Sequence, residues 1–163
     1  MSAMRLILTA MLALFFATGA QADAEFGYRT YAKTGTFEDV RDDLKDAIIN
    51  RGFVIDYVGH FNAMLERTAE AAQSVTKEGV KSPYRNAQFV QFCPAKLVHE
   101  SVSASPVGIA NCPIAVFVYE LRIEPGKIHI GYRLPVASQS QQVKKVNDKL
   151  AALLHEIALE ATK

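Results

Sequence analysis

The sequence predicts an α+β fold in which a single sheet of about five strands is covered by helices, mainly on one face. Three observations support this prediction. Segments rich in β-branched and aromatic residues alternate along the chain with segments whose apolar residues recur at helical spacing. Two strand-like segments, 114–123 and 128–134, follow one another across a short turn, which is typical of an antiparallel hairpin. The final segment, from Ser138 onward, carries a continuous apolar stripe along a helix.

The first predicted strand and helix lie between residues 26 and 52. Residues 26–33 are rich in aromatic side chains, which favours a strand. Thr36 is a suitable N-cap, because its hydroxyl can accept a hydrogen bond from an amide of the following helical turn. Gly52 suits the left-handed conformation that ends many helices. The helix between them has one apolar face, formed by Phe37, Val40, Leu44, Ala47 and Ile48.

The next part of the chain repeats this alternation. Residues 53–61 are mostly β-branched and aromatic, which predicts a second strand, and Asn62 can cap a second helix. Residues 73–86 are largely polar and include a serine–proline pair, so we expect a loop there. Residues 87–92 form a third predicted strand.

A third helix and a hairpin follow. Cys93 would occupy the cap position of this helix, because Pro94 is favoured in the first helical turn, and residues 105–108 would end it. Residues 114–123 form an almost unbroken apolar run, which predicts a central strand. The alternation in 128–134 places Ile128, Ile130 and Tyr132 on one face, and His129, Gly131 and Arg133 on the other.

Residues 1–22 have the pattern of a secretory signal peptide. A positively charged start is followed by an apolar run at 6–16, which is shorter than the roughly 20 residues of a membrane span. Small residues in an Ala-x-Ala pattern end at Ala22. We therefore expect cleavage after Ala22, a single α+β domain at 23–163, and a location in the periplasm or outside the cell. After leader cleavage, no segment is apolar and long enough to span a membrane.

The charge and motif patterns narrow the class of protein. Once Arg5 is removed with the leader, basic and acidic residues are equal in number, so we expect no nucleic-acid partner and no anionic membrane surface. The sequence contains no glycine-rich phosphate loop, serine-hydrolase elbow or metalloprotease motif. It therefore favours a binding or structural protein over an enzyme.

Two cysteines are the most distinctive chemical groups of the chain. Cys93 and Cys112 each precede a proline and adjoin an apolar run. In an oxidising compartment the first interpretation is a disulfide, which would stabilise the fold by about 3 kcal/mol. Alternatively, the start of the third helix would stabilise a Cys93 thiolate, which can act as a nucleophile, a soft-metal ligand or a redox group. Two buried thiols without a further role are a third alternative.

His60 and Met64 are further candidate ligands. Their spacing would place both on one side of a helical turn. With Cys93 and Cys112 they form a soft ligand set that suits copper, as Cu(I). Covalently attached haem is disfavoured because the Cys-x-x-Cys-His motif is missing, and haem ranks behind copper. The structural alternative makes Met64 a filler of the core and His60 a strand-end residue bonded to the backbone.

The remaining polar candidates have simpler interpretations. We expect His99, His129 and His155 to lie on solvated faces. Glu120 and Arg122 alternate with apolar residues in a predicted strand. They could line a polar pocket, but we favour an ion pair at the sheet surface.

Several short segments resemble a known family. They are Phe37 to Val40, Arg51 to Phe53, Met64 to Thr68, Phe92 and Cys93, Cys112 and Pro113, Val118 to Glu120, and Gly131 to Pro135. In them the chain resembles the family called domain of unknown function 302, in particular an exported branch from bacteria that oxidise sulfur compounds or use periplasmic electron carriers. The resemblance implies a compact α+β sandwich related to the TATA-binding-protein-like fold. It implies no catalytic residue.

These observations lead to three hypotheses on function. In the first, an exported module binds copper or a small redox ligand at the two cysteines, and its partners are periplasmic proteins of redox or sulfur metabolism. In the second, the cysteines cycle between dithiol and disulfide or carry sulfane sulfur. In the third, the chain is an interaction domain with an inert disulfide. The sequence predicts no oligomeric state.

Overall fold

The structure is a computed structural model that describes residues 27–71 and 82–163. The element order agrees with the predicted one, apart from an added short 3-10 helix. The elements are β1 (Tyr28–Thr34), α1 (Phe37–Ile49), β2 (Ile55–His60), α2 (Phe61–Ala71), β3 (Tyr84–Phe92), α3 (Ala95–Ala104), η2 (Pro106–Asn111), β4 (Ile114–Leu121), β5 (Lys127–Arg133) and α4 (Gln141–Ala161). The expected leader at residues 1–22 lies outside the described residues, as does most of the expected loop at 73–86.

The strands form one antiparallel sheet in the order β1-β5-β4-β3-β2. The predicted hairpin is confirmed, because β4 pairs with β5 along most of its length. β4 also pairs with β3 on its other side, which places it in the interior of the sheet, as its apolar run predicted.

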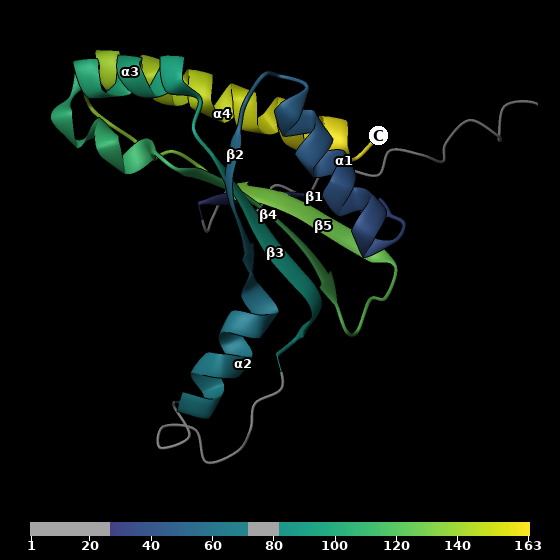
Figure 1. Ribbon diagram of the computed structural model, residues 1–163. Helices are drawn as coiled ribbons and strands as arrows, with labels where there is room; N and C mark the ends of the chain where they lie inside the picture. Colours follow the sequence, from purple (N-terminus) through teal and green to yellow (C-terminus); the bar gives the residue numbers. More distant parts are fainter. Residues whose placement is uncertain (1–26, 72–81) are drawn as a thin grey trace, which may run out of the picture.

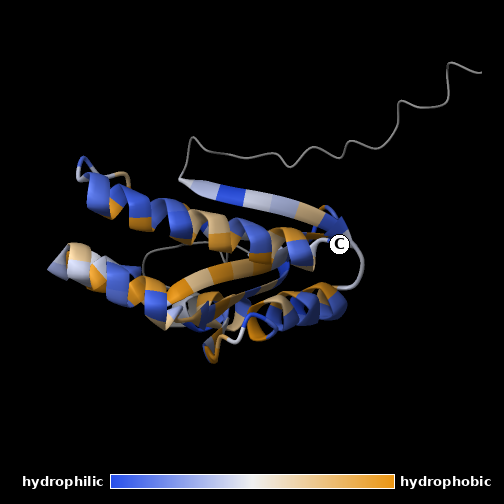
Figure 2. Ribbon diagram, turned by 90° about the horizontal axis from the view of Figure 1, so that it is seen from above, coloured by the Kyte–Doolittle hydropathy of each residue, from blue (hydrophilic) through white to orange (hydrophobic). Residues whose placement is uncertain are grey.

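The helices are distributed unevenly about the sheet (Figure 1). α1 and α4 pack against one another and cover one face, and α3 packs against α4. α2 extends beyond the lower end of the sheet in Figure 1 and contacts β3. In the described part of the chain, no helix packs across the opposite face. Figure 2 shows that the helices carry both hydrophilic and hydrophobic residues, as expected for helices with one buried face.

The main core lies between the sheet and α1 with α4. The strand side chains that point into it are fully buried, and they are Val90, Phe92, Val116, Val118, Ile128, Ile130 and Tyr132. They meet the predicted apolar faces of the helices, including Leu44 and Ile48 of α1 and Ile157 of α4. The alternation predicted for 128–134 is therefore confirmed for the buried face.

Local signals in the sequence fix several element ends. The side chain of Thr36 accepts a hydrogen bond from the Asp39 amide at 3.1 Å, which confirms the predicted N-cap of α1. Gly52 has a φ of +79°, the left-handed conformation that favours glycine. α4 begins at Gln141, three residues after the predicted start, because Ser140 provides the cap.

Several other boundaries also differ from the predicted ones: β2 begins at Ile55, α2 begins at Phe61 and so before the predicted Asn62 cap, and β3 begins at Tyr84. The two differences that follow affect candidate residues. α3 begins at Ala95, and Pro94 itself is the cap residue, with a non-helical ψ of 81°. Cys93 therefore lies one residue outside the cap position that the sequence predicted. β4 ends at Leu121 because the Leu121 carbonyl accepts a hydrogen bond from the Glu124 amide and the chain turns there.

None of the helices in residues 27–71 and 82–163 is both long enough and apolar enough to cross a bilayer.

Candidate functional site

The two cysteines are joined by a disulfide, with their Cα atoms 5.8 Å apart. Cys93 directly follows β3 and Cys112 lies just before β4. Phe92 and Ile114 are partners in the register of these two antiparallel strands. The sheet register therefore brings the cysteines together at one end of the sheet, which agrees with the disulfide interpretation.

The disulfide closes a compact unit formed by α3 and η2. The Ser101 side chain is buried in this unit, and its hydroxyl accepts a hydrogen bond from the Asn111 amide at 2.9 Å. Gly108 packs so closely that an added Cβ would lie 2.5 Å from the carbonyl carbon of Ser101. These contacts give the bond a clear structural role, which is to hold the α3–η2 unit at the sheet end.

His60 and Met64 lie toward the opposite end of the strands. In the β2–β3 register, His60 pairs with Gln88, whereas Ile55 pairs with Phe92, the neighbour of Cys93. Cys93 lies five positions along the chain from Gln88, a distance of roughly 17 Å at about 3.4 Å per residue of strand. The structure therefore brings together the two cysteines of the predicted metal set, but not the other two residues.

The immediate surroundings of these two residues are open. The His60 ring contacts the Gln88 side chain at 3.3 Å, and the Met64 side chain is 40% exposed. The interpretation of Met64 as a filler of the core is therefore wrong. Within the residues that the structure describes, no group of three or more histidine, cysteine, aspartate or glutamate side chains could hold a metal ion.

Two of the three histidines expected on solvated faces are instead partly buried. His129 stacks on Tyr119 with ring centroids 4.7 Å apart, and burial lowers its pKa. His155 on α4 shares a hydrogen bond with the hydroxyl of Tyr31, because α4 packs toward the β1 edge of the sheet. Only His99 is exposed as expected.

The predicted ion pair between Glu120 and Arg122 does not form. Arg122 lies past the end of β4 and donates to the Ser82 carbonyl at 3.1 Å. Glu120 is buried and accepts hydrogen bonds from the Gly126 amide and the Asn86 side chain, each at 2.9 Å. The Gly126 hydrogen bond contributes most to holding the pKa of Glu120 below its ordinary value, with further contributions from Asn86 and the nearby Arg85. The environment is that of a buried structural carboxylate.

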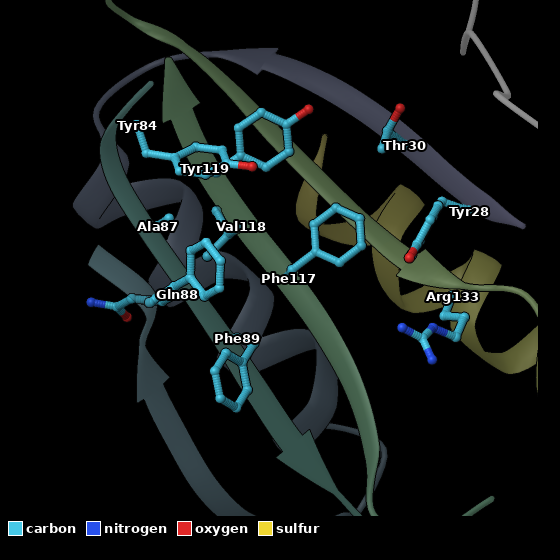
Figure 3. Close-up of a pocket in the computed structure, with 11 residues that line it drawn as sticks. Tyr28, Thr30, Tyr84, Ala87, Gln88, Phe89, Phe117, Val118, Tyr119 and Arg133 are labelled. Atoms are coloured by element: carbon cyan, nitrogen blue, oxygen red, sulfur yellow. The ribbon is translucent and has the colours of Figure 1, made fainter. Parts of the chain in front are cut away.

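A cavity of about 680 Å³ lies on the sheet face opposite to α1 and α4. Its lining is mainly aromatic, and Figure 3 shows how most of these side chains lie. The lining residues are Tyr28, Thr30, Phe61, Tyr84, Ala87, Gln88, Phe89, Phe117, Val118, Tyr119 and Arg133. We call the sheet surface that carries Tyr28, Phe89, Phe117 and Tyr119 the open face.

Aromatic rings form a continuous row across this region. Tyr28 and Phe117 have centroids 6.4 Å apart, and Phe117 and Tyr119 have centroids 6.1 Å apart. The row continues to Tyr84 at 5.4 Å and then to Phe61 of α2 at 5.7 Å. The first strand, the interior of the sheet and the start of α2 thus contribute to one surface. Such ring spacings are those of favourable aromatic pairs.

Two glycines allow the rings to lie close to the sheet. Gly131 is the register partner of Phe117, and an added Cβ there would come within 2.5 Å of the Phe117 ring. Gly59 is the partner of Phe89, whose ring would lie 2.1 Å from an added Cβ. Each ring therefore covers the glycine of the neighbouring strand.

Among the described residues that line the cavity, Arg133 is the only charged one. Its guanidinium carbon lies 5.7 Å from the centroid of the Tyr28 ring, within the range of a cation–π contact. Figure 3 shows Arg133 beside Tyr28 on one side of the cavity and Gln88 on the other. The site therefore combines an aromatic floor with a cation at one end.

The sequence analysis did not predict a site at this cavity. The available signal was that 114–121 is apolar at nearly every position, so that both faces of β4 carry apolar side chains. We interpreted that run only as a central strand. The signal predicts apolar side chains on both faces, but not which face the helices leave uncovered.

The family described as "Domain of unknown function DUF302" matches residues 28–160. The chain belongs to this family. The match extends on both sides of the segments that carried the resemblance, and it includes both cysteines and the open face of the sheet.

A solved structure of a DUF302 protein has the same fold. It is described as "Crystal structure of uncharacterized conserved protein DUF302 from Bacillus stearothermophilus", and it is similar to this chain with a TM-score of 0.67 at 12% sequence identity. The similarity covers 83% of this chain and 98% of that one. No functionally curated protein matches this chain. At this identity the comparison establishes the DUF302 fold alone.

Proposed function

We propose that this DUF302 protein is an exported binding module that takes a small apolar ligand in the cavity on the open face of its sheet. The single observation that carries the proposal is the aromatic cavity on a sheet face that α1 and α4 leave uncovered. The export follows from the expected leader at residues 1–22. The proposed binding site does not include the cysteines, because neither of them lines the cavity.

The size and chemistry of the cavity support binding of a small molecule. Ligand sites typically have volumes of roughly 300–1,000 Å³, with apolar walls and a few polar groups that orient the ligand. The volume of about 680 Å³ lies within this range, and the walls are mostly rings. Thr30, Gln88 and Arg133 contribute the polar groups.

The energetics of the open face also favour a ligand. Tyr28 is 38% exposed, and Phe89, Phe117 and Tyr119 are each only partly buried. Covering apolar surface contributes about 25 cal/mol per Å², so a ligand seated on these rings removes apolar surface of both partners from water. Ring stacking adds to this term.

The test uses a neutral aromatic probe, 2-naphthalenemethanol, added to the mature protein. We expect saturable binding in an NMR titration, with the largest shifts at Phe89, Phe117 and Tyr119. Phe117→Leu should weaken binding about fivefold or more, because a stacking ring is lost. Phe53→Leu is the matched control, since Phe53 stacks on Phe92 at the covered face. No saturable binding, or equal weakening by both variants, would contradict the proposal.

The thiol pair supports a second candidate function. Cys93 and Cys112 lie close enough to bond, so a dithiol protein of periplasmic redox or sulfur metabolism could reduce them. That reduction transfers two electrons and two protons and leaves two neighbouring thiols. Their thiolates would provide soft ligands for Cu(I). A role for His60 and Met64 as copper ligands stays a prediction, and it would require a different arrangement of β2.

This second candidate is tested on reduced protein under anaerobic conditions. Equilibrium dialysis against a Cu(I) complex, followed by metal analysis, should give bound copper that disappears in the Cys93→Ser, Cys112→Ser double variant. A His60→Ala, Met64→Ala double variant tests the two remaining ligands separately. Copper binding that survives loss of both cysteines would exclude the thiol site.

A further inference from the structure

We infer that the ligand of the open face is a planar aromatic anion, with its negative group held by Arg133 and its ring system stacked on Phe117. This inference rests on the proposed function, and it adds the chemical class of the ligand. Three features of the described residues carry it: the charge of Arg133, which has no carboxylate partner among them, its position beside the ring row, and the near-parallel rings of Phe117 and Tyr119 within that row.

The charge of Arg133 is not matched by an acid. Three other arginines pair with carboxylates: Arg41 with Asp42, Arg51 with Glu160 and Arg85 with Glu120. Within residues 27–71 and 82–163, Arg133 has no carboxylate partner and contacts the Tyr28 ring instead. Its planar set of donors suits a carboxylate or sulfonate, which it can bind through two parallel hydrogen bonds.

The position of Arg133 fixes which part of a ligand it would meet. Tyr28 contacts both Arg133 and Phe117, with its ring centroid 5.7 Å from the guanidinium carbon and 6.4 Å from the Phe117 centroid. A negative group at Arg133 therefore lies about one ring away from a group stacked on Phe117. None of the described residues lining the cavity is acidic, so nothing in the lining repels an anion.

The arrangement of the rings favours a ring over a flexible chain. Phe117 lies close over Gly131, with no room for a Cβ there, and the Phe117 and Tyr119 rings are near-parallel at an interplanar angle of 28°. A planar ligand can therefore stack on this pair, while the edge-on Tyr28 and Tyr84 rings border it on either side. An aliphatic chain would lose conformational freedom on such a surface without the gain from stacking.

The uncharged side chains of the lining indicate the chemistry of the remaining part of the ligand. On the side away from Arg133, the cavity is bounded by Tyr84, Tyr119 and Gln88 (Figure 3). These side chains offer rings, hydroxyl groups and an amide, but no charge. The ligand class is therefore a molecule with one anionic group and an uncharged, unsaturated remainder.

The experiment compares three probes of similar size by isothermal titration calorimetry: 2-naphthoate, neutral 2-naphthalenemethanol and aliphatic decanoate. We expect 2-naphthoate to bind about tenfold more tightly than each of the other two. Arg133→Gln should weaken the binding of 2-naphthoate about tenfold more than the binding of 2-naphthalenemethanol, so that the advantage of the anion disappears. Arg41→Gln is the matched control, because Arg41 lies on α1 at the other face of the sheet and should leave all three affinities unchanged.

The outcomes separate this inference from the proposed function. If 2-naphthalenemethanol binds as tightly as 2-naphthoate and Arg133→Gln changes neither, the anionic group is wrong while the cavity remains a binding site. If decanoate binds as tightly as 2-naphthoate, the planar class is wrong. If none of the probes binds, both the inference and the proposed function fail.

Discussion

Both faces of the sheet carry apolar side chains, but α1 and α4 cover only one of them. On the covered face, Val116, Val118 and Ile130 have no exposed surface and pack against α1 and α4. On the other face, Phe117 and Tyr119 of the same strand β4 lie at the border of a cavity. From Val116 to Tyr119, each residue thus differs from its neighbour in environment although both are apolar.

This difference shows that apolar character alone does not assign a side chain to the core. The covered face gains stability because helices exclude water from it. The open face also carries apolar rings, but no described helix packs across them, so part of their surface stays in contact with water. A ligand that covers these rings would gain free energy in the same way. The residues that stabilise the fold are therefore different from those that would bind a ligand.

The sharpest test of this comparison applies one substitution to both faces. Phe92→Ala should lower the free energy of unfolding by about 3–5 kcal/mol, because it empties a fully buried position. Phe117→Ala should lower it by less than about 2 kcal/mol, because part of that ring is already exposed. Urea unfolding measures both. Equal losses would mean that the open face is as much a part of the core as the covered one.

The next effect concerns the disulfide at the sheet end. Replacing both Cys93 and Cys112 by serine should lower the free energy of unfolding by about 3 kcal/mol, since the unfolded chain regains the freedom of the closed loop. The affinity for 2-naphthalenemethanol should not change in native buffer, because neither cysteine lines the cavity. Urea unfolding and calorimetry provide the two measurements. A loss of affinity would show that the disulfide affects the open face, and it would contradict the separation between residues that stabilise the fold and residues that bind the ligand.

A smaller effect is expected from the glycine beneath Phe117. Gly131→Ala should lower the free energy of unfolding by about 1–3 kcal/mol and weaken binding, because the new Cβ would displace the Phe117 ring and meet the Arg29 carbonyl oxygen at 2.6 Å. Gly35→Ala is a suitable control, since a Cβ there has an ordinary contact of 3.5 Å with Val40. If Gly131→Ala is as stable as the parent, the ring does not lie on this glycine in solution.

The smallest effect is a pH-dependent one at Glu120. Glu120→Gln should lower the free energy of unfolding by about 1–2 kcal/mol near neutral pH, because the carboxylate accepts two hydrogen bonds. Its folded pKa lies below the ordinary value of 4.5, so this stability is present above about pH 4.5 and is lost as pH falls through the folded pKa.

The gap between parent and Glu120→Gln should therefore close in acid, which urea unfolding at several pH values measures. Asn86→Ala removes one of the two donors and should show a smaller part of the same effect. A gap that stays constant from pH 7 to pH 3 would show that the carboxylate charge does not stabilise the fold.

Much of the fold was predictable because its signals are local. Apolar periodicity identified every strand and α-helix in order, and Thr36 and Gly52 marked the ends of α1 by their own backbone chemistry. The errors at Cys93 and Arg122 are also local. At Cys93 the helix begins one residue later than the cap pattern indicated, and at Arg122 the strand pattern continues past the end of β4.

The sequence by itself determined the α+β class, the interior position of β4 and the presence of two cysteines at strand ends. Tertiary structure alone decided that strand register places Cys93 beside Cys112 and leaves His60 and Met64 distant from them. It also decided that α1 and α4 cover the same face, so that Phe117 and Arg133 meet on the other. The physical reason is that periodicity reports which side chains share a face, whereas only packing of distant segments decides which face water reaches.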